Sequence, residues 1–231
     1  MAEITVTAAD GGSFNAYVAV SKKGKGPGLV VIQEIFGVND VMRGLCDGYA
    51  AAGYTAICPD LFWRQQPGIQ ITDKSKAEWD QAMSLMKGMD QDKAVDDLKA
   101  TLAAVRKHPG CSGRAGAVGF CLGGRLAFMM ATRSDANCSV SYYGVMLDSI
   151  LGEARNIKNP LLMHIAEKDQ YVPPDVQIKI KEALRTNSKV TMYTYKGADH
   201  AFARVGGVHF DADAAKMAGE RTQEFFKRNL H

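Results

Sequence analysis

The stretch AGAVGFCLGGRLAF, residues 115–128, decides the fold. A short apolar run leads into a turn that has glycine two residues before and two residues after Cys121, and a helical pattern follows. So tight a turn leaves no room for neighbouring side chains, and it lifts the cysteine clear of the sheet. The N-terminus of the following helix points at the sulfur and favours the thiolate. The stretch therefore predicts a strand, a tight turn and a helix that present an activated thiol.

The same letter pattern, Gly-x-Cys-x-Gly, recurs at residues 44–48 in different surroundings. Apolar residues at positions 41, 45 and 49 repeat every four residues, as they do in a helix, and no strand precedes them. We therefore predict that Cys46 is structural. Buried cysteines commonly fill cores as small apolar side chains, and we expect this role for the remaining three: Cys58, Cys111 and Cys138.

Outward from residues 115–128, apolar runs alternate with amphipathic segments along most of the chain. The predicted strands are residues 29–32, 54–58, 115–120, 140–143, 161–165 and 190–195. The predicted helices are 39 or 40 to 52, one or two within 73–106, 122–132, 173 or 174 to 185, and 211–229. This alternation predicts an α/β fold, a mostly parallel central sheet flanked by helices on both faces.

The N-terminal residues 4–20 read instead as two strands around a turn at residues 10–12, and a loop rich in lysine and glycine is expected at 22–28. The chain of 231 residues has 46% hydrophobic and 23% charged residues, an ordinary globular composition. These values fit a single domain over residues 1–231.

The charge balance, the first ten residues and the cysteine spacing argue against several classes of function. Lys plus Arg number 28 against 25 Asp plus Glu, with no long run of like charge, so we expect no nucleic-acid or membrane partner. The first ten residues, MAEITVTAAD, have no basic start and no apolar core, and the five cysteines show no CxxC or zinc spacing. We expect a cytoplasmic protein, a monomer or homodimer, with no metal and no cofactor.

A cysteine nucleophile needs a base and an orienting acid. His200 and Asp169 both lie in loops directly after predicted strands, where parallel sheets place their chemistry. Asp199 competes as the acid, but adjacent loop residues rarely face each other, and it fits better as a brace of the loop. His164 lies inside an apolar strand and is expected to be a hydrogen-bonded core histidine. The order Cys121, Asp169, His200 is that of the α/β-hydrolase fold.

With these residues in place, the chain resembles the dienelactone hydrolase family over nearly its whole length. The resemblance is carried by QEIFG at 33–37, YTAICPDL at 54–61, GFCLGG at 119–124, YYG at 142–144, DQYVP at 169–173 and ADHAFAR at 198–204. It implies an α/β-hydrolase whose catalytic triad is Cys121, Asp169 and His200.

The resemblance implies further roles around the triad. Glu34 would sit beside the resting thiol and help generate the thiolate, and the backbone N–H groups of Ile35 and Leu122 would form the oxyanion hole. Arg204 would bind a substrate carboxylate and pair with Glu34 when the site is empty. Three aromatic residues complete the candidate substrate-binding set: Phe36, Trp79 and Tyr142.

Trp79 marks a departure from the pattern. Family members that cleave dienelactone carry a second arginine for the substrate carboxylate, and ungapped matching puts Trp79 in its place. Lys74, Lys76 or Arg64 could substitute there as a point charge, but not as a bidentate fork. Met83 and Met86 nearby would make the pocket more apolar.

The resulting expectation is a hydrolase that cleaves a small ester or lactone through a thioester acyl-enzyme on Cys121. Two alternatives stay open. The same triad could act on neutral or hydrophobic activated esters, thioesters or phosphotriesters. The activated thiol could instead serve a redox sensor or a binding module, although a sensor has no need of an ordered acid and histidine.

Overall fold

The computed structural model describes residues 2–231. They divide into two compact units: unit 1 runs to Ala117, and unit 2 comprises Val118–His231. Strand β5 (Cys111–Phe120) contributes residues to both. No helix among these described residues is long and apolar enough to cross a membrane. A single domain over residues 1–231 stays a prediction.

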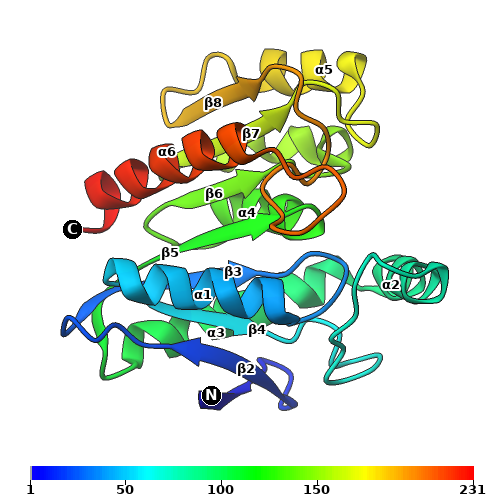
Figure 1. Ribbon diagram of the computed structural model, residues 1–231. Helices are drawn as coiled ribbons and strands as arrows, with labels where there is room; N and C mark the ends of the chain where they lie inside the picture. Colours follow the sequence, from blue (N-terminus) through cyan, green and yellow to red (C-terminus); the bar gives the residue numbers. More distant parts are fainter. Residues whose placement is uncertain (1) are drawn as a thin grey trace. The chain divides into compact units, whose positions relative to one another are not determined.

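In unit 1 the strands follow the order β1-β2-β4-β3-β5. β3 and β4 are parallel, whereas β2 is antiparallel to both β1 and β4. Helix α1 lies on one side of these strands and α3 on the other (Figure 1). The elements of unit 1 that precede β5 are β1 (Ala2–Thr7), β2 (Ser13–Ala19), β3 (Gly26–Ile32), α1 (Asp40–Ala52), β4 (Thr55–Pro59), α2 (Lys76–Gly88) and α3 (Gln91–Lys107).

In unit 2 the order is β5-β6-β7-β8, and β7 runs parallel to both β6 and β8. Figure 1 shows α6 in front of these strands and α4 behind them, so both faces are covered. An apolar core that includes Phe128, Leu161 and Ile180 lies among α4, β7 and α5. The elements that follow β5 are α4 (Leu122–Arg133), β6 (Ser139–Tyr142), the 3₁₀ helix η1 (Leu147–Asn156), β7 (Leu161–Ala166), α5 (Pro174–Leu184), β8 (Val190–Tyr195) and α6 (Ala212–Leu230).

Short-range signals in the sequence fix most helix boundaries. Asn39 caps α1 by accepting a hydrogen bond from the Met42 N–H, and Gly53 ends the helix with a left-handed backbone, φ 114°. The segment predicted as one helix or two is two helices. Asp90 separates them, because its carboxylate caps the start of α3.

Beyond shifts of one or two residues, the structure differs from the prediction at three elements. The loop expected at residues 22–28 ends at residue 25, and Gly26 and Gly28 belong to β3. Glycine is needed there because a Cβ at Gly26 would lie 1.8 Å from the Gly53 carbonyl oxygen. β5 begins at Cys111 rather than at residue 115. Residues 112–114 are exposed and carry no apolar run, so no pattern indicated a strand there. η1 was not predicted, although its apolar residues Leu147, Ile150, Leu151 and Ala154 recur at helical spacing and pack in the core of unit 2.

Candidate active site

The turn that presents Cys121 is as tight as its glycines predict. Cys121 has φ 57° and ψ −114°, a strained conformation for a side chain with a Cβ. A Cβ at Gly119 would lie 1.9 Å from the Gly123 carbonyl oxygen, and one at Gly124 would lie 2.4 Å from the Tyr142 carbonyl oxygen. The strand, the turn and α4 therefore pack backbone against backbone, and only glycine fits at these two positions.

Backbone hydrogen bonds hold Cys121 on both sides. Its N–H donates to the Tyr142 carbonyl at 3.1 Å, and its own carbonyl accepts from the N–H groups of Arg125 at 3.2 Å and Val145 at 3.4 Å. No side chain caps the N-terminus of α4. The dipole of α4 and the N–H groups of its first turn, which begins at Leu122, therefore favour negative charge next to the sulfur.

His200 and Asp169 form the predicted pair. The His200 Nδ1 atom lies 2.8 Å from the Asp169 Oδ2 atom, and both residues are buried. The other carboxylate oxygen, Asp169 Oδ1, accepts from the Tyr171 N–H at 2.9 Å. Asp169 follows β7 and His200 follows β8, so adjacent parallel strands deliver the two side chains to the same edge.

Asp199, the competing acid, makes other contacts. Its Oδ1 atom accepts from the backbone N–H of His200 at 2.6 Å, and its Oδ2 atom lies 3.4 Å from His209 Nδ1. Asp199 therefore braces the loop that carries His200, while Asp169 contacts the imidazole ring. This outcome agrees with the preference for Asp169 that chain order suggested.

The electrostatics around His200 favour the imidazolium. Burial lowers the pKa of His200, but the negative charge of Cys121 and hydrogen bonds with Asp169 and Cys121 outweigh it and raise the pKa to about 10. A histidine in this state at neutral pH is a proton donor. His200 therefore lies between the Cys121 sulfur and the Asp169 carboxylate with its protonated form favoured.

Strained backbone conformations concentrate in unit 2. Among residues 2–231 the non-glycine residues with positive φ are Cys121, Tyr143, Met146 and Ala201. All four belong to unit 2, in loops that follow β5, β6 and β8. Strain of this kind persists where surrounding contacts over-determine the backbone, and it concentrates at functional sites.

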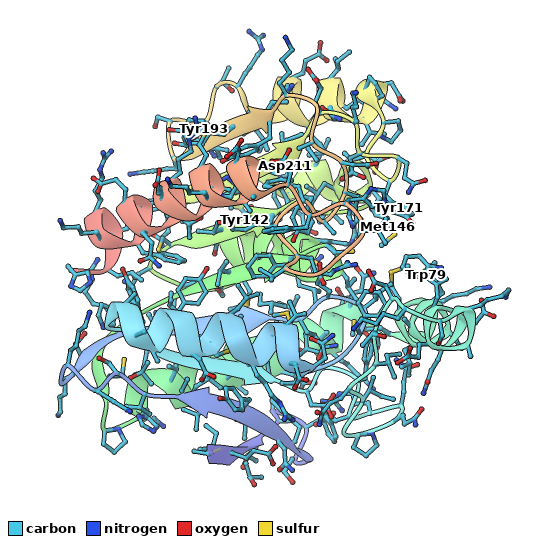
Figure 2. All side chains as sticks on the ribbon, viewed as in Figure 1. Trp79, Tyr142, Met146, Tyr171, Tyr193 and Asp211 are labelled. Carbon is cyan, nitrogen blue, oxygen red and sulfur yellow. The ribbon has the colours of Figure 1, made fainter. Side chains whose placement is uncertain are left out.

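Two aromatic neighbours of His200 escaped the sequence prediction. The ring centroid of Tyr143 lies 5.2 Å from that of His200, and that of Tyr171 lies 4.8 Å away, both edge to face. Tyr143 is buried, whereas Tyr171 is 45% exposed. Figure 2 labels Tyr171, which lies in the loop between β7 and α5. The only signal in the sequence was their position, one directly after β6 and the other two residues beyond Asp169.

Tyr142, a predicted pocket residue, points into the interior of unit 2. Its side chain is buried, its ring stacks on Phe120 at 4.7 Å, and its hydroxyl lies 2.6 Å from Thr222 Oγ1 of α6. A role for its ring in contacting substrate stays a prediction. His164 is the hydrogen-bonded core histidine that was expected: burial, followed by the charge of Arg221, lowers its pKa to about 3.

Unit 1 carries the remaining candidates. Glu34, Ile35 and Phe36 follow β3 and are buried. Their loop is fixed at Gly37, where φ is 76° and a Cβ would lie 1.9 Å from the Ile69 carbonyl oxygen. Trp79 of α2 packs on Phe36, with ring centroids 5.8 Å apart.

Two of the cationic groups considered near Trp79 form ion pairs. Arg64 is held by the carboxylates of Asp10 at 2.6 Å and Asp97 at 2.8 Å, so it is a structural ion pair. Lys76 pairs on the surface with Asp80. Arg204 lies in unit 2, in the loop that carries His200, and is half-buried. Burial raises the pKa of Tyr171, and the positive charge of Arg204 opposes this with a smaller effect.

A cavity of about 340 Å³ also opens in unit 1, between the β1–β2 hairpin and the loop after β4. Phe14, Tyr17 and Trp63 form its aromatic wall, and Arg43 and Asp60 supply charge. None of its lining residues within the described chain is a predicted site residue. The cavity therefore does not mark the candidate active site.

Comparison with known proteins agrees with this geometry. A family model described as the dienelactone hydrolase family matches residues 14–230. A protein of Azospirillum brasilense, provisionally named a carboxymethylenebutenolidase, is 55% identical and covers 100% of both chains. The carboxymethylenebutenolidase of Pseudomonas putida is 36% identical over 96% of this chain and 94% of its own.

A solved structure supports the fold as well. A Klebsiella pneumoniae protein, described provisionally as a dienelactone hydrolase, superposes with a TM-score of 0.84 at 28% identity and covers 98% of this chain and 99% of its own. The predicted α/β-hydrolase fold is confirmed. With a strained cysteine turn, an Asp–His pair after β7 and β8, and matches over almost its full length, the chain belongs to the dienelactone hydrolase family and is a hydrolase of that type.

Proposed function

We propose that the protein hydrolyses a small ester or lactone through a covalent thioester on Cys121. The observation that carries the proposal is the hydrogen-bonded cluster of Cys121, His200 and Asp169, in which the pKa of His200 is raised to about 10. An imidazolium that hydrogen-bonds to the cysteine sulfur can donate its proton to the leaving group once the thiolate has attacked.

The proposed reaction has two halves. The Cys121 thiolate attacks the substrate carbonyl carbon, the carbon–oxygen bond of the ester breaks, and the His200 imidazolium gives its proton to the leaving alkoxide. Water then attacks the thioester while neutral His200 accepts its proton. The carbon–sulfur bond breaks, the acid product leaves, and the thiolate–imidazolium pair is restored. Asp169 holds the imidazole ring in place throughout.

The negative charge that develops on the substrate's carbonyl oxygen needs hydrogen-bond donors. The uncapped N-terminus of α4 supports the N–H of Leu122 in this role. The N–H of Ile35 as the second donor, and Glu34 as the group that helps generate the thiolate, are proposed from the family pattern of residues 33–37. Glu34→Gln tests the role of the carboxylate.

Two observations bear on the substrate. Relatives at 36% identity are carboxymethylenebutenolidases, which supports a lactone, and Arg204 supplies a cation for a substrate carboxylate. Trp79 packs on Phe36 instead of offering a second cation, which favours a less polar substrate. We therefore propose a small lactone or ester that carries at most one carboxylate, with neutral activated esters as a second candidate class.

The test compares Cys121→Ala with Cys111→Ala, because both cysteines are buried and equally exposed, at 7%. Rates are measured on cis-dienelactone, neutral lactones and p-nitrophenyl esters. Cys121→Ala should lose about a thousandfold or more in rate, and Cys111→Ala should keep its activity. Mass spectrometry of the acid-quenched parent enzyme should find an acyl group on Cys121.

Full activity in Cys121→Ala would overturn the proposal. Oxidation of Cys121 without any acyl adduct on the whole ester panel would instead favour a redox sensor. A strong preference for substrates with two carboxylates would exclude the less polar substrate class.

A further inference from the structure

Thr222 breaks the pattern of the helix that carries it. The buried stripe of α6 repeats every four residues and is otherwise apolar: Ala214, Ala218, Thr222, Phe226 and Leu230. A buried hydroxyl lowers stability unless it is hydrogen-bonded, and an alanine would continue the stripe. The contacts of this hydroxyl therefore explain its presence.

The Thr222 hydroxyl joins two neighbouring strands. Its Oγ1 atom lies 2.6 Å from the Tyr142 hydroxyl on β6 and 2.9 Å from His164 Nε2 on β7. Tyr142 and His164 are register partners in the parallel β6–β7 pair, and their rings lie 4.2 Å apart. On its other side His164 Nδ1 lies 2.8 Å from the Tyr195 hydroxyl of β8. All four side chains are buried.

The peptide unit between Tyr142 and Tyr143 links this hydrogen-bond network to Cys121. Its carbonyl, that of Tyr142, accepts from the Cys121 N–H at 3.1 Å. Its N–H, that of Tyr143, donates to the His164 carbonyl at 2.8 Å. One rigid peptide plane thus links the backbone of His164 to the backbone of Cys121. Tyr143 has φ 37°, so the plane is held in a strained orientation.

We infer that Thr222 is a positioning residue for Cys121. Its hydroxyl contacts Tyr142 and His164, and it acts through them by fixing the peptide plane that holds the Cys121 N–H. The inference rests on the proposed role of Cys121 as the nucleophile. Its physical basis is that a strained turn keeps its geometry only while its neighbours are fixed.

The experiment uses three variants of the full chain. Thr222→Val is nearly isosteric and removes the hydroxyl, whereas Thr222→Ser keeps it. The matched control is Thr101→Val in α3, because Thr101 is equally buried, at 0% against 1%, and its hydroxyl donates to the Asp97 carbonyl. The readouts are kcat and KM on a p-nitrophenyl ester, and the rate at which iodoacetamide alkylates Cys121, followed by peptide mass spectrometry.

Thr222→Val should lower kcat about tenfold, with KM changed by less than about twofold, and should slow the alkylation of Cys121 to a similar extent. Thr222→Ser should restore both rates, and Thr101→Val should leave both unchanged. A folded Thr222→Val protein with parental kcat and alkylation rate would overturn the inference. If Thr222→Val does not fold, Tyr142→Phe decides: it should lower both rates about threefold, and parental rates would overturn the inference.

The two proposals fail in different ways. If Cys121→Ala keeps its activity, the proposed function fails, while the alkylation rates still test whether Thr222 positions the thiol. If Cys121→Ala is inactive and Thr222→Val behaves like the parent enzyme in both assays, only the positioning role fails.

Discussion

The two Gly-x-Cys-x-Gly motifs of this chain should respond in opposite directions to the same substitution. At Gly119 a new Cβ would lie 1.9 Å from the Gly123 carbonyl oxygen. At Gly44, on the exposed side of α1, a new Cβ would meet no atom within 4 Å. Gly119→Ala and Gly44→Ala therefore add the same methyl group to the same motif, once in the turn before Cys121 and once in a helix.

The magnitudes follow from these contacts. Carbon and oxygen atoms cannot approach within 2 Å, and the atom that obstructs Gly119→Ala belongs to the backbone, so the whole turn must open by about 1 Å or more. We expect a loss of about 3–5 kcal/mol in the free energy of unfolding. Gly44→Ala should gain about 0.5–1 kcal/mol, because alanine loses less backbone entropy in a helix.

Urea denaturation at neutral pH, followed by far-UV circular dichroism, measures both changes. Gly48→Ala is the control, because it lies at the other glycine of the helical motif, where a Cβ again meets nothing within 4 Å. The esterase rate should fall in Gly119→Ala and stay at the parental level in the two helical variants. A Gly119→Ala protein whose free energy of unfolding lies within about 1 kcal/mol of the parent value would refute the steric reasoning. Destabilisation by Gly44→Ala would refute the argument from helix propensity.

Three further outcomes are expected. Asp169→Asn should lower kcat about a hundredfold or more and bring the pKa of His200 down from about 10, as an NMR titration of the ring would detect; an unchanged titration would contradict the pairing. Burial and then Arg221 lower the pKa of His164 to about 3, so its neutral form stabilises the fold fully above about pH 6.5. That contribution, a few kcal/mol, is lost as the pH falls from 6.5 towards 3, and urea titrations of His164→Gln should show a flatter acid limb than the parent protein. Trp79→Arg should raise kcat/KM on dienelactone about tenfold relative to a neutral ester, and an unchanged ratio would exclude Trp79 from selecting the substrate.

Much of the fold follows from short stretches of sequence. Asn39 and Gly53 bound α1 because capping and left-handed φ depend only on the nearest residues. The boundary of β3 could not be predicted in this way. Residue 26 must be glycine because the backbone at Gly53, far away in the sequence, passes too close for a side chain, and not because a loop requires it. Long-range contacts of this kind leave no local pattern.

Some residues of the candidate site could be predicted from the sequence, and others could not. The triad candidates were visible because each requires a reactive residue type directly after a strand, and the order Cys121, Asp169, His200 restricts the choice further. Tyr143 and Tyr171 were not visible as neighbours of His200, because edge-to-face packing depends on where β6, β7 and β8 place their loops.

By itself, the sequence determined the alternation of strands and helices, the glycine turn around Cys121 and the candidates for the acid and the histidine, since these are local or ordered properties of the chain. Only the tertiary structure decided that Asp169 contacts the His200 ring while Asp199 braces its backbone. It also decided that Thr222 joins Tyr142 to His164 beneath α6. A hydrogen bond depends on distance and direction in space, and packing sets both.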